Sequence, residues 1–162
     1  MQNIYEDFAD RLRNGDVRIS GANFTPLNAS KVSVTLDEIV EYVVLNTDGL
    51  NEIVLSTVFH HRLVWIHPFF DGSGRTVSHA INLLLMRMGF PSAIILKNDR
   101  KKYYEALNQA NKESYLKLTL LMIQALKRSL NIYMNAMPGN EEDYDLISTI
   151  VAEDTFFMGR SR

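Results

Sequence analysis

The spacing of proline is the sequence feature that most constrains the fold. Only 4 of the 162 residues are proline, and they stand at positions 26, 68, 91 and 138. In the long intervals between them, apolar residues recur at the 3.6-residue period of an amphipathic helix. Because a proline ends or kinks a helix, the chain is expected to form several helices separated by short breaks.

Five helices are predicted in these intervals. Thr35 and Glu38 have the spacing of a capping box, so the first helix is predicted to begin at Thr35. The other four helices are predicted over residues 52–66, 75–88, 98–110 and 114–134. The side chains expected to face the core from the first and third helices are Ile39, Val40, Val43, Val44, Ala80, Leu83, Leu84 and Met88.

The segments near the N-terminus follow a different pattern. Residues 17–19 and 31–34 combine β-branched and polar side chains, which predicts two short strands and a small β-hairpin. Near the other end, a C-terminal helical extension is predicted over about residues 141–155. The expected architecture is mainly α: a single domain over residues 1–162, with a helical core over about residues 17–135 and a hairpin near the N-terminus.

The composition favours a cytoplasmic globular protein. Hydrophobic residues make up 46% of the chain, enough for a buried core, and the formal net charge of −2 lacks the positive excess of nucleic-acid binders. The absence of cysteine excludes disulfides and thiolate metal sites. The first residues are polar and acidic, unlike a signal peptide, and no apolar stretch is long enough to span a bilayer. We therefore expect a soluble protein with no membrane and no nucleic-acid partner.

The glycine-rich break between the second and third predicted helices carries the strongest functional signal. Gly72, Ser73 and Gly74 lead directly into a helix. Glycines allow consecutive backbone N–H groups to turn toward one point and form an anion-binding nest. The helix N-terminus adds unpaired N–H groups and a positive dipole end, and Arg75 adds a guanidinium fork. The combination predicts a phosphate site.

Asp71 and His67 precede this nest. A carboxylate beside bound phosphates is suited to holding Mg²⁺, and a histidine can accept a proton from an attacking hydroxyl. The separate parts of the pattern are common: most Gly-x-Gly turns between helices bind no phosphate, and a histidine at a helix end is more often a cap or a packed core residue. The complete string over residues 67–75 is far more specific than its parts.

That string, His-Pro-Phe-Phe-Asp-Gly-Ser-Gly-Arg over residues 67–75, resembles the signature of the Fic family. The resemblance covers about residues 17–135. It implies a helical core with a small hairpin flap that docks the target polypeptide as an added strand. In this chain the flap residues would be Phe24, Thr25 and Pro26.

The resemblance also implies an activity, because most characterised members of the family transfer AMP from ATP, with Mg²⁺, to a Ser, Thr or Tyr hydroxyl of a protein. It implies that His67 is the general base and that Asp71 holds Mg²⁺. The residues expected to bind the nucleotide are Gly72, Ser73, Gly74, Arg75, His79 and Tyr104.

Two positions depart from the signature. Ser73 replaces an asparagine, which keeps a hydroxyl but loses one donor. The family has a second arginine one turn after the first, which engages the donor's terminal phosphate. We assign its place to His79, and a neutral imidazole is a poorer phosphate clamp than a guanidinium. A donor other than ATP is therefore one alternative. The alternative function is a catalytically weakened Fic module that binds nucleotide or acts as a regulatory or toxin component.

Regulation and assembly also leave alternatives open. Many family members carry an inhibitory helix of the form Ser/Thr-x-x-x-Glu-Gly/Asn. Thr149 and Glu153 match it in part, although a plain surface helix is the better interpretation. The expected partners are a nucleotide and a target protein that presents the modified hydroxyl. An inhibitory partner chain and a homo-oligomer are further alternatives.

Overall fold

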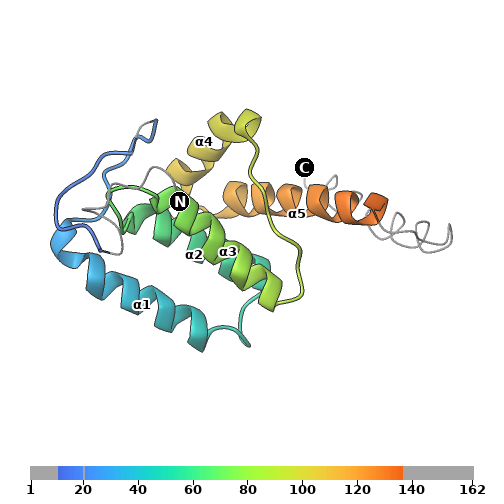
Figure 1. The fold of residues 1–162 in the computed structure, drawn as a ribbon, viewed down its shortest axis with the longest axis horizontal. Coiled ribbons are helices and arrows are strands. Elements are labelled where there is room, and N and C mark those ends of the chain that lie inside the picture. The colour runs from blue at the N-terminus through green and yellow to red at the C-terminus, as the bar shows by residue number, and fades with distance from the viewer. Residues whose placement is uncertain (1–10, 20, 137–162) are drawn as a thin grey trace.

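The computed structural model describes residues 11–19 and 21–136, whose regular elements are all helical (Figure 1). Their bounds are α1 (Val32–Leu45), α2 (Glu52–Ile66), α3 (Ser73–Arg87), α4 (Arg100–Ala110) and α5 (Leu116–Ala136), with short 3-10 turns η2 (Ala29–Lys31) and η3 (Lys97–Asp99) before α1 and α4. The prediction of a mainly α fold is confirmed. The C-terminal extension, with Thr149 and Glu153, lies outside the described residues. Among the described helices, none is long and apolar enough to cross a membrane.

Helix α2 is the centre of the fold, because it packs against α1, α3 and α5 (Figure 1). Asn51 begins it by accepting hydrogen bonds from the N–H groups of Ile53 and Val54, as an N-cap residue does. Leu55 and Ile66, near its two ends, are fully buried. A helix that is buried on several sides is expected to be apolar on several sides. The bounds of α2 confirm the span predicted over residues 52–66.

The predicted start of the first helix is wrong. Helix α1 begins at Val32, so Thr35 lies inside the helix and does not cap it. The cap lies earlier: the Asn28 side chain accepts a hydrogen bond from the Ser30 N–H and begins the 3-10 turn η2, which leads into α1. Residues 31–34, predicted as a strand, therefore belong to η2 and α1.

The predicted inner faces of α1 and α3 are only partly correct. Ile39 and Val43 are buried, but Val40 and Val44 are exposed. In α3 the fully buried apolar side chains are Val77, Ile81 and Leu85, and Leu83 is exposed. Both helices carry apolar residues on more than one side, so the sequence period alone did not select the face that contacts α2.

The β-hairpin expected near the N-terminus is not seen in the described residues. Backbone groups of this segment bond to other parts of the fold instead of to a second strand. The Leu27 N–H donates to the Trp65 carbonyl (3.0 Å), and the Leu27 carbonyl accepts from the side chain of Arg13. Phe24, Thr25 and Pro26 lie in the same irregular segment. Phe24 packs against the core, Pro26 is buried and Thr25 is exposed.

Candidate active site

The chain changes direction at His67, between α2 and α3. Helix α2 ends where the His67 N–H donates to the Leu63 carbonyl (3.0 Å), and His67 adopts a left-handed conformation with φ 48° and ψ 66°. Such a conformation costs a residue with a side chain about 1–2 kcal/mol. Surrounding contacts must therefore hold His67 in place.

Arg13 supplies these contacts. Its side chain is 2% exposed, and its guanidinium donates to the His67 carbonyl (2.7 Å) and the Ile66 carbonyl (3.0 Å). Its backbone N–H donates to the Pro68 carbonyl (2.9 Å). A single residue from the N-terminal segment thus binds three consecutive carbonyls around the histidine.

Arg13 is not among the residues that the sequence predicts for the site. An arginine between Leu12 and Asn14 belongs to no helical or strand pattern, and it looks like an ordinary surface charge. No signal in the single sequence identifies it, because its partners at the site are backbone carbonyls about 54 positions further along the chain.

The environment of His67 favours the neutral imidazole. Partial burial lowers the pKa of His67 below its ordinary value, and the positive charge of Arg13 lowers it further. The carbonyl of Val64 acts in the opposite direction, but the net shift is downward. A neutral imidazole at neutral pH can accept a proton from a hydroxyl.

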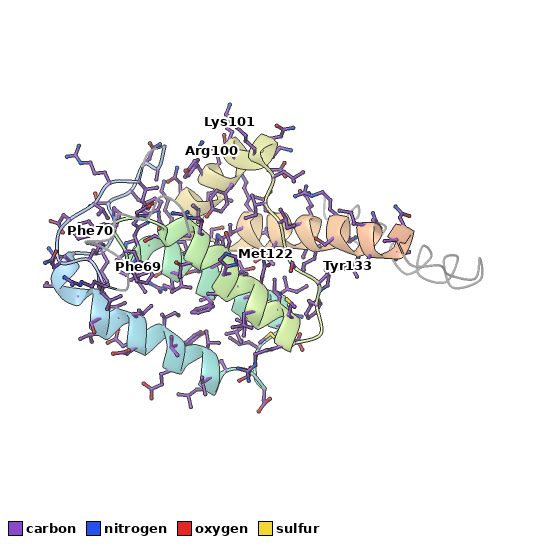
Figure 2. The ribbon with its side chains drawn as sticks, in the orientation of Figure 1. Phe69, Phe70, Arg100, Lys101, Met122 and Tyr133 are labelled. Atoms are coloured by element: carbon purple, nitrogen blue, oxygen red, sulfur yellow. The ribbon has the colours of Figure 1, made fainter. Side chains whose placement is uncertain are left out.

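The Ser73 side chain is held inside the loop. It is 2% exposed. The Ser73 hydroxyl donates to the Phe69 carbonyl (2.9 Å) and accepts from the Phe69 N–H (2.9 Å). The hydroxyl therefore bonds both backbone groups of Phe69 and holds the two ends of the loop together. Figure 2 shows Phe69 and Phe70 at the end of the molecule where this loop lies.

The first turn of α3 forms the open part of the loop. Gly72 has a φ of 77°, a conformation that favours glycine, and no side chain caps the helix. Because the first N–H groups of a helix have no partner within it, those of Ser73, Gly74 and Arg75 are available to an anion. Nothing lies within 4 Å of the point where a Gly74 side chain would begin.

Asp71 and Arg75 pair with each other across this turn. One Asp71 carboxylate oxygen accepts from the Gly72 N–H (2.6 Å), and the other lies 3.2 Å from the Arg75 guanidinium. The Arg75 and Asp71 side chains are 51% and 42% exposed, respectively. An exposed ion pair of this kind is weak, so each of the two side chains can leave its partner and bind a ligand instead.

The place of the family's second arginine belongs to Ser78. The signature puts two residues between its arginines, and three positions after Arg75 is Ser78, so our assignment to His79 was one residue too late. Ser78 lines a pocket beside Gly74 and donates to the Gly74 carbonyl (3.0 Å). His79 is exposed and is not among the lining residues.

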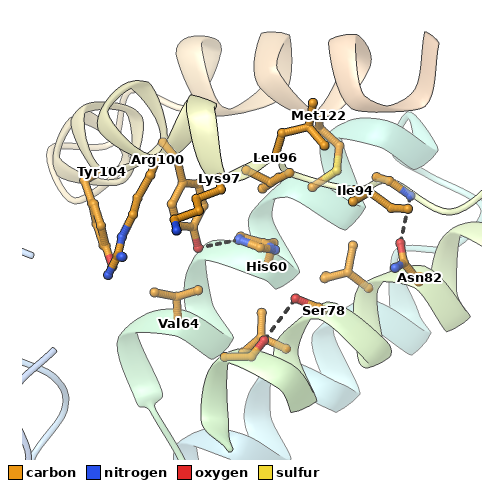
Figure 3. Close-up of a pocket in the computed structure, with 16 residues that line it drawn as sticks. His60, Val64, Ser78, Asn82, Ile94, Leu96, Lys97, Arg100, Tyr104 and Met122 are labelled. Carbon is orange, nitrogen blue, oxygen red and sulfur yellow. Dashed lines mark hydrogen bonds between the residues drawn. The ribbon is translucent and has the colours of Figure 1, made fainter. Parts of the chain in front are cut away.

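This pocket has a volume of about 440 Å³ and lies between α3 and the segment that leads into α4 (Figure 3). Tyr104 lines it and also contacts the N-terminal segment, since a side chain at Gly21 would begin 3.3 Å from the Tyr104 ring. Gly21 has a φ of 87°, which also favours glycine. The flap residues Thr25 and Pro26 border a separate hollow with Asp16 and Val17, so the structure does not bring them into the same pocket.

Comparison with known proteins identifies the family. The Fic/DOC family model matches residues 1–85. The protein adenylyltransferase fic-1 of Caenorhabditis elegans is 31% identical over 138 residues, which cover 83% of this chain and 26% of the relative. The protein adenylyltransferase Fic of Nematostella vectensis is 41% identical over 85 residues, which cover 52% of this chain and 20% of the relative. The chain belongs to the Fic/DOC family.

A solved structure supports the same assignment. The structure titled Fic-1 (aa134 - 508 E274G) from C. elegans aligns with a TM-score of 0.62 and 33% identity, over 74% of this chain and 36% of that chain. The present chain spans about a fifth to a quarter of the length of these two curated relatives. The expectation of a Fic-type helical core is therefore confirmed.

Proposed function

We propose that this chain transfers AMP from ATP to a Ser, Thr or Tyr hydroxyl of a protein. The observation that carries the proposal is the placement of a half-buried His67, held by Arg13, a few residues before the open first turn of α3. The curated relatives in C. elegans and N. vectensis, which are named protein adenylyltransferases, support the same reaction class.

In the proposed reaction His67 is the general base. The target hydroxyl oxygen attacks the α-phosphorus of ATP, the bond between that phosphorus and the bridging oxygen to the β-phosphate breaks, and pyrophosphate leaves. The hydroxyl proton passes to the imidazole of His67. The lowered pKa of His67 supports this role, because the side chain then begins in its neutral, proton-accepting form.

The first turn of α3 is the proposed phosphate site. The backbone N–H groups of Ser73 and Gly74 would donate to the donor phosphates and to the charge that develops at the transferred phosphorus. The Gly72 N–H, which donates to Asp71, would join them once Asp71 turns to the metal. Arg75 adds a charged fork once it releases Asp71. Ser73 contributes its backbone only, since its hydroxyl is engaged by Phe69.

Asp71 is suited to hold Mg²⁺ at this site. Magnesium is commonly bound by one or two carboxylates together with substrate phosphates, and Asp71 presents an exposed carboxylate beside the phosphate site. Within the described residues, no group of three or more His, Asp or Glu could form a metal site without substrate. Mg²⁺, when bound, neutralises phosphate charge; Asp71 must then exchange Arg75 for the metal.

The alternative is a Fic module that binds nucleotide with little or no transfer. Two observations favour it: Ser78 has no charge with which to hold a terminal phosphate, and Ser73 turns its hydroxyl away from the phosphate site. Such a chain would act as a regulatory or toxin component. Transfer and binding must therefore be measured separately.

Label transfer tests the proposed reaction. The protein is incubated with Mg²⁺, cell lysate and ATP labelled at either the α- or the γ-phosphate, and the labelled proteins are separated by gel electrophoresis. We expect label that depends on His67 from α-labelled ATP only: it should disappear with His67→Ala, whereas the γ-label transferred by kinases of the lysate should be the same with either protein. His79→Ala removes an exposed imidazole outside the pocket and is the matched control, which should transfer normally.

The other outcomes are equally informative. Label from γ-labelled ATP that disappears with His67→Ala would show that the chain transfers phosphate rather than AMP. Equal labelling by the wild type and His67→Ala would contradict the role of His67. Calorimetric binding of ATP without any labelled protein would favour the alternative module.

A further inference from the structure

The pocket between α3 and the start of α4 carries an unbalanced positive charge. Lys97 and Arg100 line it, and none of its lining residues is an acid. Figure 3 shows both cations on the same wall as Tyr104, across from Ser78 on α3. A pocket with two cations and no acid favours an anionic ligand.

Neighbouring acidic groups do not neutralise these cations. Asp99 stands between Lys97 and Arg100 in the sequence, but its carboxylate lies 3.0 Å from the guanidinium of Arg128 on α5. In the part of the chain that the structure describes, neither Lys97 nor Arg100 forms an ion pair. The guanidinium of Arg100 instead lies 5.6 Å from the centre of the Tyr104 ring.

The rest of the pocket adds no competing charge. His60 lines it with its imidazole bonded to the Tyr103 hydroxyl (2.9 Å), and burial lowers the pKa of His60 to about 4, so it is neutral at neutral pH. Burial also raises the pKa of the Tyr103 hydroxyl, which therefore keeps its proton. The anion-binding capacity of the pocket comes from Lys97 and Arg100.

The pocket is continuous with the proposed phosphate site. Gly74, in the first turn of α3, is one of its lining residues, and so is Ser78, which follows one turn later on the same helix. The Ser78 hydroxyl is short and donates to the Gly74 carbonyl (3.0 Å). Helix α3 therefore offers no charged side chain for phosphates that extend from its first turn into the pocket.

We infer that Lys97 and Arg100 bind the β- and γ-phosphates of the nucleotide donor in place of the missing second arginine of α3. This inference rests on the proposed function for the identity of the donor. The cations of the η3–α4 segment would then determine that the donor is a nucleoside triphosphate. The transferred α-phosphate would stay at the first turn of α3.

Calorimetric binding of ATP and of AMP, each with Mg²⁺, tests the assignment independently of catalysis. We expect Lys97→Ala and Arg100→Ala each to weaken ATP binding about tenfold, which corresponds to about 1.4 kcal/mol, because each variant would lose one charge-assisted contact to a phosphate. AMP lacks the two outer phosphates, so its affinity should stay within about twofold. Arg100→Lys should lose less than Arg100→Ala.

Lys101→Ala is the matched control. Lys101 is the next residue of α4, is exposed, does not line the pocket and points outward (Figure 2). This variant should bind both nucleotides as the wild type does. Adding Ser78→Arg to the Lys97→Ala/Arg100→Ala variant should restore preference for ATP over AMP, which a merely structural role of the two cations does not predict.

The outcomes separate this inference from the proposed function. Equal losses for ATP and AMP would overturn it, since the cations would then act on the nucleoside part or on the fold. If the Lys97 and Arg100 variants bind ATP as tightly as a wild type that labels its target, this inference is overturned and the proposed function stands. The variants could lose ATP binding selectively while the wild type transfers no label. That result would support the assignment of the two cations and contradict the transferase reaction. If the wild type binds no ATP, both fail.

Discussion

The two halves of the loop between α2 and α3 differ in how they are held. In the first half, Arg13 bonds the carbonyls of His67 and Ile66, and its side chain is buried. In the second half, Asp71 and Arg75 are held chiefly by an ion pair that is about half exposed. The buried serine, Ser73, joins the halves by bonding the backbone of Phe69.

This difference teaches which parts of the site are formed before a ligand binds. Buried hydrogen bonds to charged groups are strong and are lost only with local unfolding, so the position of His67 is fixed in advance. An exposed ion pair contributes little and is readily exchanged. The phosphate side is therefore completed by the ligand. Variants of the first half should chiefly affect stability and turnover, and variants of the second half should chiefly affect nucleotide affinity.

The largest effect on stability is expected for Arg13→Lys. Lysine keeps the charge but its single ammonium cannot reach all the carbonyls that the guanidinium binds, so the free energy of unfolding should fall by about 2–4 kcal/mol. In the folded protein, kcat should fall more than KM rises. Urea denaturation and steady-state kinetics measure the two effects. Arg11→Lys, at an exposed position, is the control; equal behaviour of the two variants would refute the bracing role of Arg13.

A smaller loss is expected for Ser73→Ala. Removal of the buried hydroxyl leaves the N–H and the carbonyl of Phe69 without their partner, which should lower the free energy of unfolding by about 1–3 kcal/mol. Ser78→Ala removes an exposed hydroxyl from the same helix and should cost less than about 0.5 kcal/mol. Thermal denaturation compares the two. If Ser73→Ala is as stable as Ser78→Ala, then Ser73 does not join the halves.

The pH dependence of transfer should report the environment of His67. A general base acts in its neutral form, so kcat/KM should rise with pH through an apparent pKa below the ordinary value of 6.5 and then level off. Loss of the positive charge in Arg13→Met should move this pKa upward, so that activity at pH 6 falls more than activity at pH 8. An apparent pKa that is identical in the two proteins would contradict the electrostatic effect of Arg13.

The smallest effect on stability is expected for Arg75→Ala. The lost partner is an exposed carboxylate, so the free energy of unfolding should change by less than about 1 kcal/mol. Affinity for ATP should nevertheless fall about tenfold, because Arg75 would no longer reach the phosphates. Denaturation and calorimetry on the same sample give both values. A large loss of stability with unchanged affinity would reverse the proposed division between the halves.

The sequence by itself predicted much of the framework. The span of α2 follows from its apolar residues between the Asn51 cap and Pro68, and both signals are local. The position of the loop follows from its glycines and from the helix start that comes after it. Family membership followed from the string over residues 67–75, which is contiguous in the chain and needs no tertiary information.

Local rules failed where the neighbouring element decides the outcome. Thr35 and Glu38 have the right spacing for a cap, but the 3-10 turn that Asn28 begins starts the helix earlier. Helix α3 has apolar residues at position 81 and at positions 83–86, which point to several sides, and contact with α2 selected Ile81 and Leu85. The strand-like segment at residues 17–19 found no pairing partner, and no strand forms there.

The tertiary structure alone decided how the loop is held and what surrounds it. The sequence determined that a histidine, a carboxylate, two glycines and an arginine would meet within nine residues, because covalent connectivity keeps them together. It could not show that Arg13, from far upstream, would bind the carbonyls of Ile66 and His67, or that Lys97 and Arg100 would face Ser78 across a pocket. These contacts join segments that are distant in the chain, and only the packing of α2 against α3 and of α4 against α5 brings them together.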